Sequence, residues 1–162
     1  SMCYPISSFG AHVAARPRTS LKTRGNVAMC GTFGYELDPR KLTDDEKAEV
    51  KQQIADYRKY HRLVREGDFY RLVSPTENDF YCAWEFVSPD KTEAMMTAVV
   101  MRQPETRYCV QRLRGLDPKT YYQDEETGTV YSGAMLMNAG LNLTRDVYED
   151  GTSVTKHFKA VK

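Results

Sequence analysis

The spacing of apolar positions predicts one long helix in the chain. After residue 43 the apolar side chains recur three and four positions apart, which is the repeat of one helix face. Thr43 and Glu46 have the capping-box spacing, acidic residues fill the first turn, and Gly67 stands at the end. We therefore predict a helix over residues 44–66, whose packed face consists of Val50, Ile54, Tyr57, His61 and Val64.

The first 40 residues contain two apolar stretches without alternation. Residues 2–6 form a short run, and residues 27–37 form a longer one that is interrupted by Gly31 and Gly34. Such runs are typical of strands buried on both faces of a parallel sheet. The segment between them, residues 18–26, is polar and basic. Two strands and one helix cannot cover both faces of a parallel sheet, so this third of the chain should need partners.

After Gly67 the pattern changes to short runs rich in Tyr, Phe, Val and Thr, separated by turn signals such as SPDK at 88–91. We predict strands over residues 69–73, 80–87, 93–102, 107–113, 120–123, 129–131, 139–143 and 154–158. Regularly spaced short strands indicate an antiparallel β-sandwich. The expected chain is mostly β with one long α-helix, and the domain boundary falls between residues 1–66 and residues 67–162.

Composition and charge narrow the function classes. Hydrophobic residues make up 41% and charged residues 28%, with a formal net charge of +1, so neither nucleic acid nor an anionic membrane is an expected partner. No apolar run approaches the roughly 18 residues of a membrane span. The four cysteines are far apart and form no C-x-x-C pair. We expect no metal and no cofactor, and the cysteines favour a cytoplasmic location.

Five segments of the chain resemble, in order, motifs of the α-galactosidases of glycoside hydrolase family 36. They are YPISSFGAHV at 4–13, LKTRGNVA at 21–28, GTFGYELD at 31–38, GDFYRL at 67–72, and SG at 132–133 with LMNAGL at 136–141. Several long motifs in one order are far more specific than one short motif, and these motifs span nearly the whole chain.

The resemblance implies an architecture. The family has an N-terminal β-rich domain, a (β/α)₈ barrel and a C-terminal β-sandwich. On this basis residues 2–8 are the seventh barrel strand, residues 27–37 hold the eighth strand, and the helix over 44–66 is the eighth helix. Residues 1–66 are then the end of the catalytic barrel, and residues 67–162 are the C-terminal β-sandwich.

The resemblance also implies a chemistry. The family hydrolyses terminal α-linked galactose, as in raffinose or melibiose, with retention, using an aspartate nucleophile in a K-W-D motif and a second aspartate as acid and base. The single tryptophan, Trp84, lies between Ala83 and Glu85, so K-W-D is absent. The acid/base segment is expected before residue 4. We expect the catalytic aspartates upstream, an inactive and structural chain, and a homo-oligomeric parent such as a tetramer.

The chain departs from the family pattern at one place. In the family, several residues including Asn-His-Gln lie between the equivalents of Pro17 and Arg18, which are adjacent here. Either this protein has a shorter loop, or the sequence omits residues of that loop.

Four polar residues are candidates for the substrate-binding rim of the barrel. Glu36 and Asp38 share one strand face about 7 Å apart, near the strand end where catalytic residues collect. The alternative is that Asp38 shapes the turn before Pro39 and Glu36 makes a structural ion pair. Ser8 and His12 follow the other barrel strand, with loop hydrogen bonding as their alternative role.

Strand aromatics suggest a second function, a carbohydrate-binding β-sandwich module. The candidates for stacking on a sugar are Trp84, Tyr81, Tyr121 and Tyr122, for which the alternative is core packing. The last two are adjacent, so their rings must lie on opposite faces of a sheet. Of the remaining histidines, we expect His61 to be packed or at an interface, and His157 to be solvated in the terminal strand.

The expected barrel end leads to a prediction about stability. Without neighbouring strands and helices, residues 1–40 should be disordered or paired with another copy, because bare apolar surface and open strand edges favour association. We expect the helix to stay docked on the sandwich through Ile54, Tyr57 and His61. In limited proteolysis, cleavage should concentrate between Arg16 and Lys41, while the part after Gly67 resists. Equal protection of both regions in a monomer would contradict this prediction.

Overall fold

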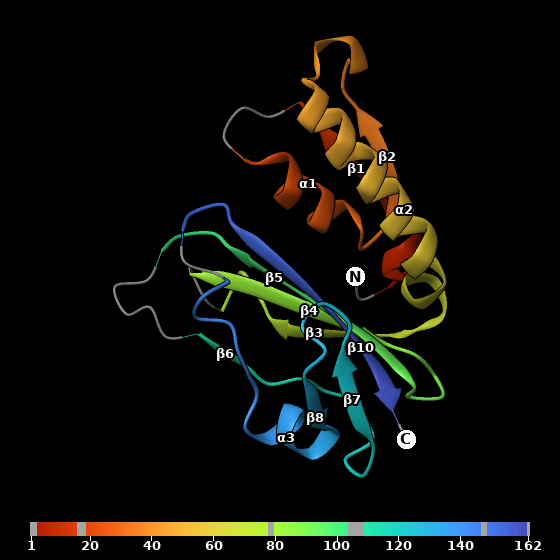
Figure 1. The fold of residues 1–162 in the computed structure, drawn as a ribbon, viewed down its shortest axis with the longest axis vertical. Helices are drawn as coiled ribbons and strands as arrows, with labels where there is room; N and C mark the ends of the chain where they lie inside the picture. The colour runs from red at the N-terminus through yellow and green to blue at the C-terminus, as the bar shows by residue number, and fades with distance from the viewer. Residues whose placement is uncertain (1–2, 16–18, 78–79, 104–108, 147–148, 162) are drawn as a thin grey trace.

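The computed structural model describes residues 3–15, 19–77, 80–103, 109–146 and 149–161 (Figure 1). It consists of an N-terminal layer of helices with a small parallel sheet, followed by a larger antiparallel sheet. The prediction of a mostly β chain with an antiparallel sheet is confirmed. The junction of Pro17 and Arg18 lies outside the described residues.

The N-terminal layer has the order strand, helix, strand, helix. A 3₁₀ turn, η1 (Ile6–Ser8), precedes β1 (Gly10–Ala14), and α1 (Leu21–Ala28) leads to β2 (Thr32–Glu36). The two strands are parallel, with register from Gly10 opposite Thr32 to Ala14 opposite Glu36. The second 3₁₀ turn, η2 (Pro39–Lys41), connects to the long helix α2 (Asp44–Glu66). The expected parallel relationship of the two strands is thus present.

The predicted bounds of both N-terminal strands were wrong. The strand predicted over residues 2–6 lies later, at β1, and the run 27–37 holds the end of α1 as well as β2. Helix α1 escaped prediction because its buried positions include Thr23, Gly25 and Ala28, which give no apolar periodicity. Its N-terminus is fixed by the Ser20 side chain, which accepts a hydrogen bond from the Thr23 N–H at 3.1 Å.

Helix α2 has the predicted bounds and capping box. The Thr43 hydroxyl accepts from the Glu46 N–H at 3.2 Å, and the Thr43 N–H donates to Glu46 Oε2 at 2.8 Å. Gly67 ends the helix with a φ of −77°, so the left-handed geometry is not the reason for glycine here. A Cβ at Gly67 would lie 2.5 Å from the Leu63 carbonyl oxygen and 2.9 Å from that of Val87, so close backbone approach requires the glycine.

The packed face of α2 is only partly the predicted one. Gln53, Leu63 and Val64 are its buried residues, whereas His61 is exposed. The helix docks on the sheet through Leu63 and Val64, which form a cluster with Phe86 and Met95, rather than through the Ile54–Tyr57–His61 stripe. Tyr57 turns to the N-terminal strands and stacks on Phe33 at 5.0 Å between ring centroids. Because α2 packs on the large sheet with one part and on the small parallel sheet with another, its apolar residues do not form a single stripe.

The large sheet is antiparallel and places the last strand in its interior. Its spatial order is β3 (Asp68–Val73), β4 (Tyr81–Val87), β5 (Glu93–Val100), β10 (Ser153–Val161), β7 (Tyr121–Asp124) and β8 (Val130–Ser132). A separate short pair is formed by β6 (Val110–Gln111) and β9 (Leu141–Asn142). The strands predicted over 107–113 and 139–143 therefore shrink to this pair among the described residues. The unpredicted helix α3 (Gly133–Asn138) is capped by Ser132, whose hydroxyl accepts from the Met135 N–H at 3.1 Å.

Both faces of the large sheet are covered in its centre. On one face, residues of β4, β5 and β10 pack with α3, β9 and the segment around Leu113 to form the largest cluster. On the other face, Phe86 and Met95 pack against helix α2. This two-sided burial explains why β5 reads as an almost unbroken apolar run instead of an alternating one.

One carboxyl group lies inside this core. Glu85 on β4 is fully buried, and its Oε2 accepts from the Arg114 N–H at 2.9 Å, while its Oε1 has no partner among the described residues. Burial raises the pKa of Glu85 to about 8, although the bond from the Arg114 backbone acts in the opposite direction. The folded protein therefore holds a proton on Glu85 at neutral pH.

This proton makes stability depend on pH. In the unfolded chain the Glu85 carboxyl loses its proton near 4.5, whereas the folded protein keeps it to about 8, so unfolding releases a proton between these values. Glu85 should lower the free energy of unfolding as pH rises through this window, by at most about 1.4 kcal/mol per pH unit. Chemical denaturation of Glu85→Gln should show a flatter profile, with Glu149→Gln as an exposed control. An unchanged profile would contradict the prediction.

Candidate functional site

The small parallel sheet presents one covered face and one bare face. Ala11 and Val13 of β1, with Phe33 and Tyr35 of β2, belong to the cluster that includes Leu21 and Ala28 of α1. Because side chains alternate along a strand, the neighbouring residues point to the opposite face. That opposite face carries His12 and Glu36, both exposed in this chain.

His12 and Glu36 are brought together by the register. His12 lies opposite Gly34, and Glu36 follows Gly34 by two residues on the same face. His12 Nδ1 lies 2.7 Å from Glu36 Oε1, with 44% and 63% of the two side chains exposed. A Cβ at Gly34 would lie 3.0 Å from His12 Cδ2, so the glycine leaves room for the imidazole ring.

The other two rim candidates are placed differently. Asp38 caps η2: it accepts from the Arg40 N–H at 3.0 Å and forms an ion pair with the Arg40 guanidinium, which lowers the pKa of Asp38. Ser8 lies in η1 before β1, and its hydroxyl donates to the Pro5 carbonyl at 2.7 Å. Since β1 and β2 are parallel, Ser8 is at the end of the sheet opposite to Glu36. These are the contacts expected if Asp38 shapes the turn before Pro39 and Ser8 makes a loop hydrogen bond.

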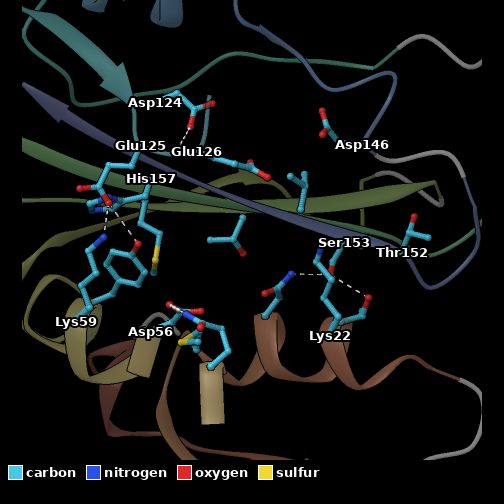
Figure 2. A pocket seen from close by; sticks show the side chains of 18 of the residues that line it. Lys22, Asp56, Lys59, Asp124, Glu125, Glu126, Asp146, Thr152, Ser153 and His157 are labelled. Carbon is cyan, nitrogen blue, oxygen red and sulfur yellow. Dashed lines mark hydrogen bonds and ion pairs between the residues drawn. The ribbon is translucent and has the colours of Figure 1, made fainter. Parts of the chain in front are cut away.

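A cleft between the helices and the large sheet was not predicted at all. It has a volume of about 1140 Å³ and lies between α1, α2, β10 and the turn after β7 (Figure 2). On the α1 side, the buried Ser153 hydroxyl of β10 donates to Thr23 Oγ1 at 2.9 Å and accepts from Asn26 Nδ2 at 2.9 Å. Ser153 lies 130 positions from Thr23 and 127 positions from Asn26 in the chain, so no local pattern could reveal the cleft.

His157 lies at the other end of the cleft and is buried, so the prediction of a solvated histidine was wrong. It stands on β10, which lies between β5 and β7, and the Tyr60 ring of α2 packs on its imidazole. Its Nε2 lies 2.6 Å from Glu93 Oε1, and its Nδ1 lies 2.7 Å from Glu125 Oε2. Glu125 also contacts Lys59 of α2 and Lys159. Burial opposes ionisation of Glu125, but hydrogen bonds from Lys159, Lys59 and His157 outweigh it and lower the pKa to about 2.

The aromatic candidates do not form a sugar-stacking platform. Tyr122 is fully buried, and its hydroxyl donates to the Lys91 carbonyl at 2.7 Å. Tyr121 is 57% exposed, which confirms that the adjacent pair occupies opposite faces. Trp84 and Tyr81 are half-buried against the two clusters of the large sheet. Of these four side chains, that of Tyr121 is the one that is mostly exposed.

The described residues contain no group of three or more His, Cys, Asp or Glu side chains placed to hold a metal ion. Among the helices that the structure describes, none is long and apolar enough to cross a membrane.

Comparison with protein families identifies the class of the chain. Residues 1–67 match the Melibiase family model, and residues 81–158 match the model of the glycosyl hydrolase family 36 C-terminal domain. Among curated relatives, the alpha-galactosidase AgaA of Geobacillus stearothermophilus is 49% identical over 150 residues, covering 88% of this chain and 20% of AgaA. The bifunctional alpha-galactosidase/sucrose kinase AgaSK of Mediterraneibacter gnavus is 43% identical, covering 88% of this chain and 16% of AgaSK.

Solved structures agree with the sequence matches. The galactosidase domain of AgaSK superposes with a TM-score of 0.92 at 41% identity, covering 98% of this chain and 23% of that one. A variant of AgaA solved in complex with raffinose gives a TM-score of 0.90 at 45% identity, with 98% and 23% covered. The fold and the sequence matches thus point to one family of proteins. The chain belongs to glycoside hydrolase family 36, and it spans about a fifth of the length of its relatives.

The fit between His12 and Gly34 generates a prediction. Gly34→Ala should displace the imidazole ring and lengthen its contact with Glu36, because the new methyl group would lie 3.0 Å from the ring. The His12 ring resonances in an NMR spectrum should shift. Gly10→Ala is the matched control, since its Cβ would meet the same ring at an ordinary 3.8 Å. Equal His12 spectra for both variants would contradict the prediction.

Proposed function

We propose that the chain is the C-terminal portion of a retaining α-galactosidase that releases terminal α-linked galactose from oligosaccharides such as raffinose or melibiose. The observation that carries the proposal is the ordered match of both family models along one chain, from residues 1–67 to residues 81–158. The relative AgaA, solved in complex with raffinose, supports this substrate class.

The division of the chain follows from the same proposal. Residues 1–66 are the end of the catalytic (β/α)₈ barrel, with its seventh and eighth strands and eighth helix, and residues 67–162 form the C-terminal β-sandwich. The strand–helix–strand–helix order and the parallel pairing of β1 with β2 support the barrel assignment. The helices cover one face of this pair, and the bare face with His12 and Glu36 is the one that would face the barrel interior.

The contribution of this chain to the reaction is then structural and positional. Glu36 ends β2, and active sites of barrels lie at the C-terminal ends of the strands. Retention needs two carboxyl groups about 5 to 5.5 Å apart. Glu36 and Asp38 instead contact His12 and Arg40, which suits orientation of neighbouring groups better than nucleophilic attack. We assign the two catalytic aspartates to the upstream part of the barrel.

The setting of the parent enzyme completes the proposal. We propose a homo-oligomeric parent, in line with the family resemblance. The four cysteines of this chain are free thiols, which supports the reducing cytoplasm as its location.

The proposal predicts a difference between the chain and the complete enzyme. The isolated 162-residue chain should not hydrolyse a nitrophenyl α-galactoside, whereas the complete protein that carries it should release nitrophenol and galactose. The absorbance of released nitrophenol, measured on repurified samples, reports the activity of the isolated chain and of the complete protein. Turnover by the chain that survives repurification would show that its own carboxylates are catalytic. An inactive complete protein would contradict the α-galactosidase assignment.

A further inference from the structure

Polar side chains are paired across the cleft at two places. On one side Thr23 and Asn26 of α1 contact Ser153 of β10, and on the other side Lys59 of α2 reaches Glu125. Figure 2 shows Lys59, Glu125 and His157 converging from the helix and the sheet. The cleft is thus bridged at two places, and the second bridge contains a buried histidine.

Both ring nitrogens of His157 have a carboxylate partner. A neutral imidazole has one N–H donor and one lone pair, whereas the imidazolium has two donors. Both ring nitrogens of His157 lie within 2.7 Å of a carboxylate oxygen, Glu93 on one side and Glu125 on the other. When both carboxylates are ionised, both contacts are hydrogen bonds only if each nitrogen carries a proton. The geometry therefore fits the doubly protonated ring, which can donate to Glu93 and to Glu125 at the same time.

The groups around His157 come from four elements. β5 supplies Glu93, the turn after β7 supplies Glu125, α2 supplies Lys59 and Tyr60, and β10 itself supplies Lys159. The Tyr60 ring lies 4.4 Å from the His157 ring between centroids. The Glu125 N–H also donates to the His157 carbonyl at 3.0 Å, which fixes Glu125 beside the ring. Helix α2 thus contacts the cluster by a ring and by an ion pair.

The two carboxylates depend on His157 to different degrees. Glu125 has two lysine partners besides the histidine, Lys59 and Lys159. Glu93 contacts His157 as its one ion-pair partner among the described residues. When the ring loses a proton, a nitrogen lone pair must face a carboxylate across less than 3 Å, which is unfavourable in a buried place.

We propose that His157 is a proton-dependent latch that holds the middle of helix α2, at Lys59 and Tyr60, against the large sheet. With the proton bound, the ring joins Glu93 to Glu125 and thereby keeps Glu125 in reach of Lys59. Without it, the contact between α2 and the turn after β7 loosens. The hydrophobic cluster of Leu63 and Val64 remains, so the opening is local. This device couples the helical layer to the sheet whichever sugar the parent enzyme hydrolyses.

Hydrogen exchange of the full chain, measured from about pH 6 to about pH 9, tests the latch. The protection factors of α2 amides around Lys59 should fall as pH rises, by at most about tenfold per pH unit, since one proton is involved. In His157→Gln they should be low at all pH values. His61→Gln, on the exposed side of the same helix, should behave as the wild type does. A wild-type profile without pH dependence would overturn the proposal.

Glu93→Gln separates a latch from simple loss of packing. The glutamine amide can donate to the unprotonated Nε2 of a neutral His157, while the Nδ1–H still donates to Glu125. This variant should retain protection around Lys59 and lose the dependence on pH. Low protection at every pH, as expected for His157→Gln, would mean that the cluster is only a packing contact. A pH dependence equal to that of the wild type would assign the titration to another group.

Discussion

Strand β10 lies between β5 and β7 and joins the two halves of the large sheet. The large sheet is continuous only when this strand, which ends at Val161, has been placed. β10 also carries Ser153 and His157, which reach the two N-terminal helices. One strand therefore completes the sheet, covers part of the core and joins the sheet to the helical layer.

The two-sided cover of the large sheet has a consequence for its polar residues. Glu85, on the side of the largest cluster, has only a backbone N–H as partner and stays protonated. On the side of the helices, His157 lies between two carboxylates. Burial alone disfavours a charge, whereas partners of opposite sign favour it. The same sheet thus holds an acid without an ionic partner on one face and a histidine between two carboxylates on the other.

The small parallel sheet follows a different rule. Its covered face packs on α1 and α2, and its bare face displays His12 and Glu36 to solvent in this chain. In an exposed position their ion pair adds little to stability. The glycine that makes room for the His12 ring is explained better by the placement of that ring than by stability. This agrees with the proposal that the bare face belongs to a barrel interior.

Features with local signals could be predicted from the residue pattern: helix α2 with its capping box, the antiparallel character after Gly67, and the family, through long motifs in one order. Features that depend on pairing between distant residues emerge only in the folded chain. Helix α1 packs through small residues that carry no apolar period, because Gly25 lies against Gln53. His157 looked solvated because its partners, Glu93 and Glu125, lie 64 and 32 positions away. A charge pattern along the chain shows which groups exist, but the register of a central strand decides which of them meet.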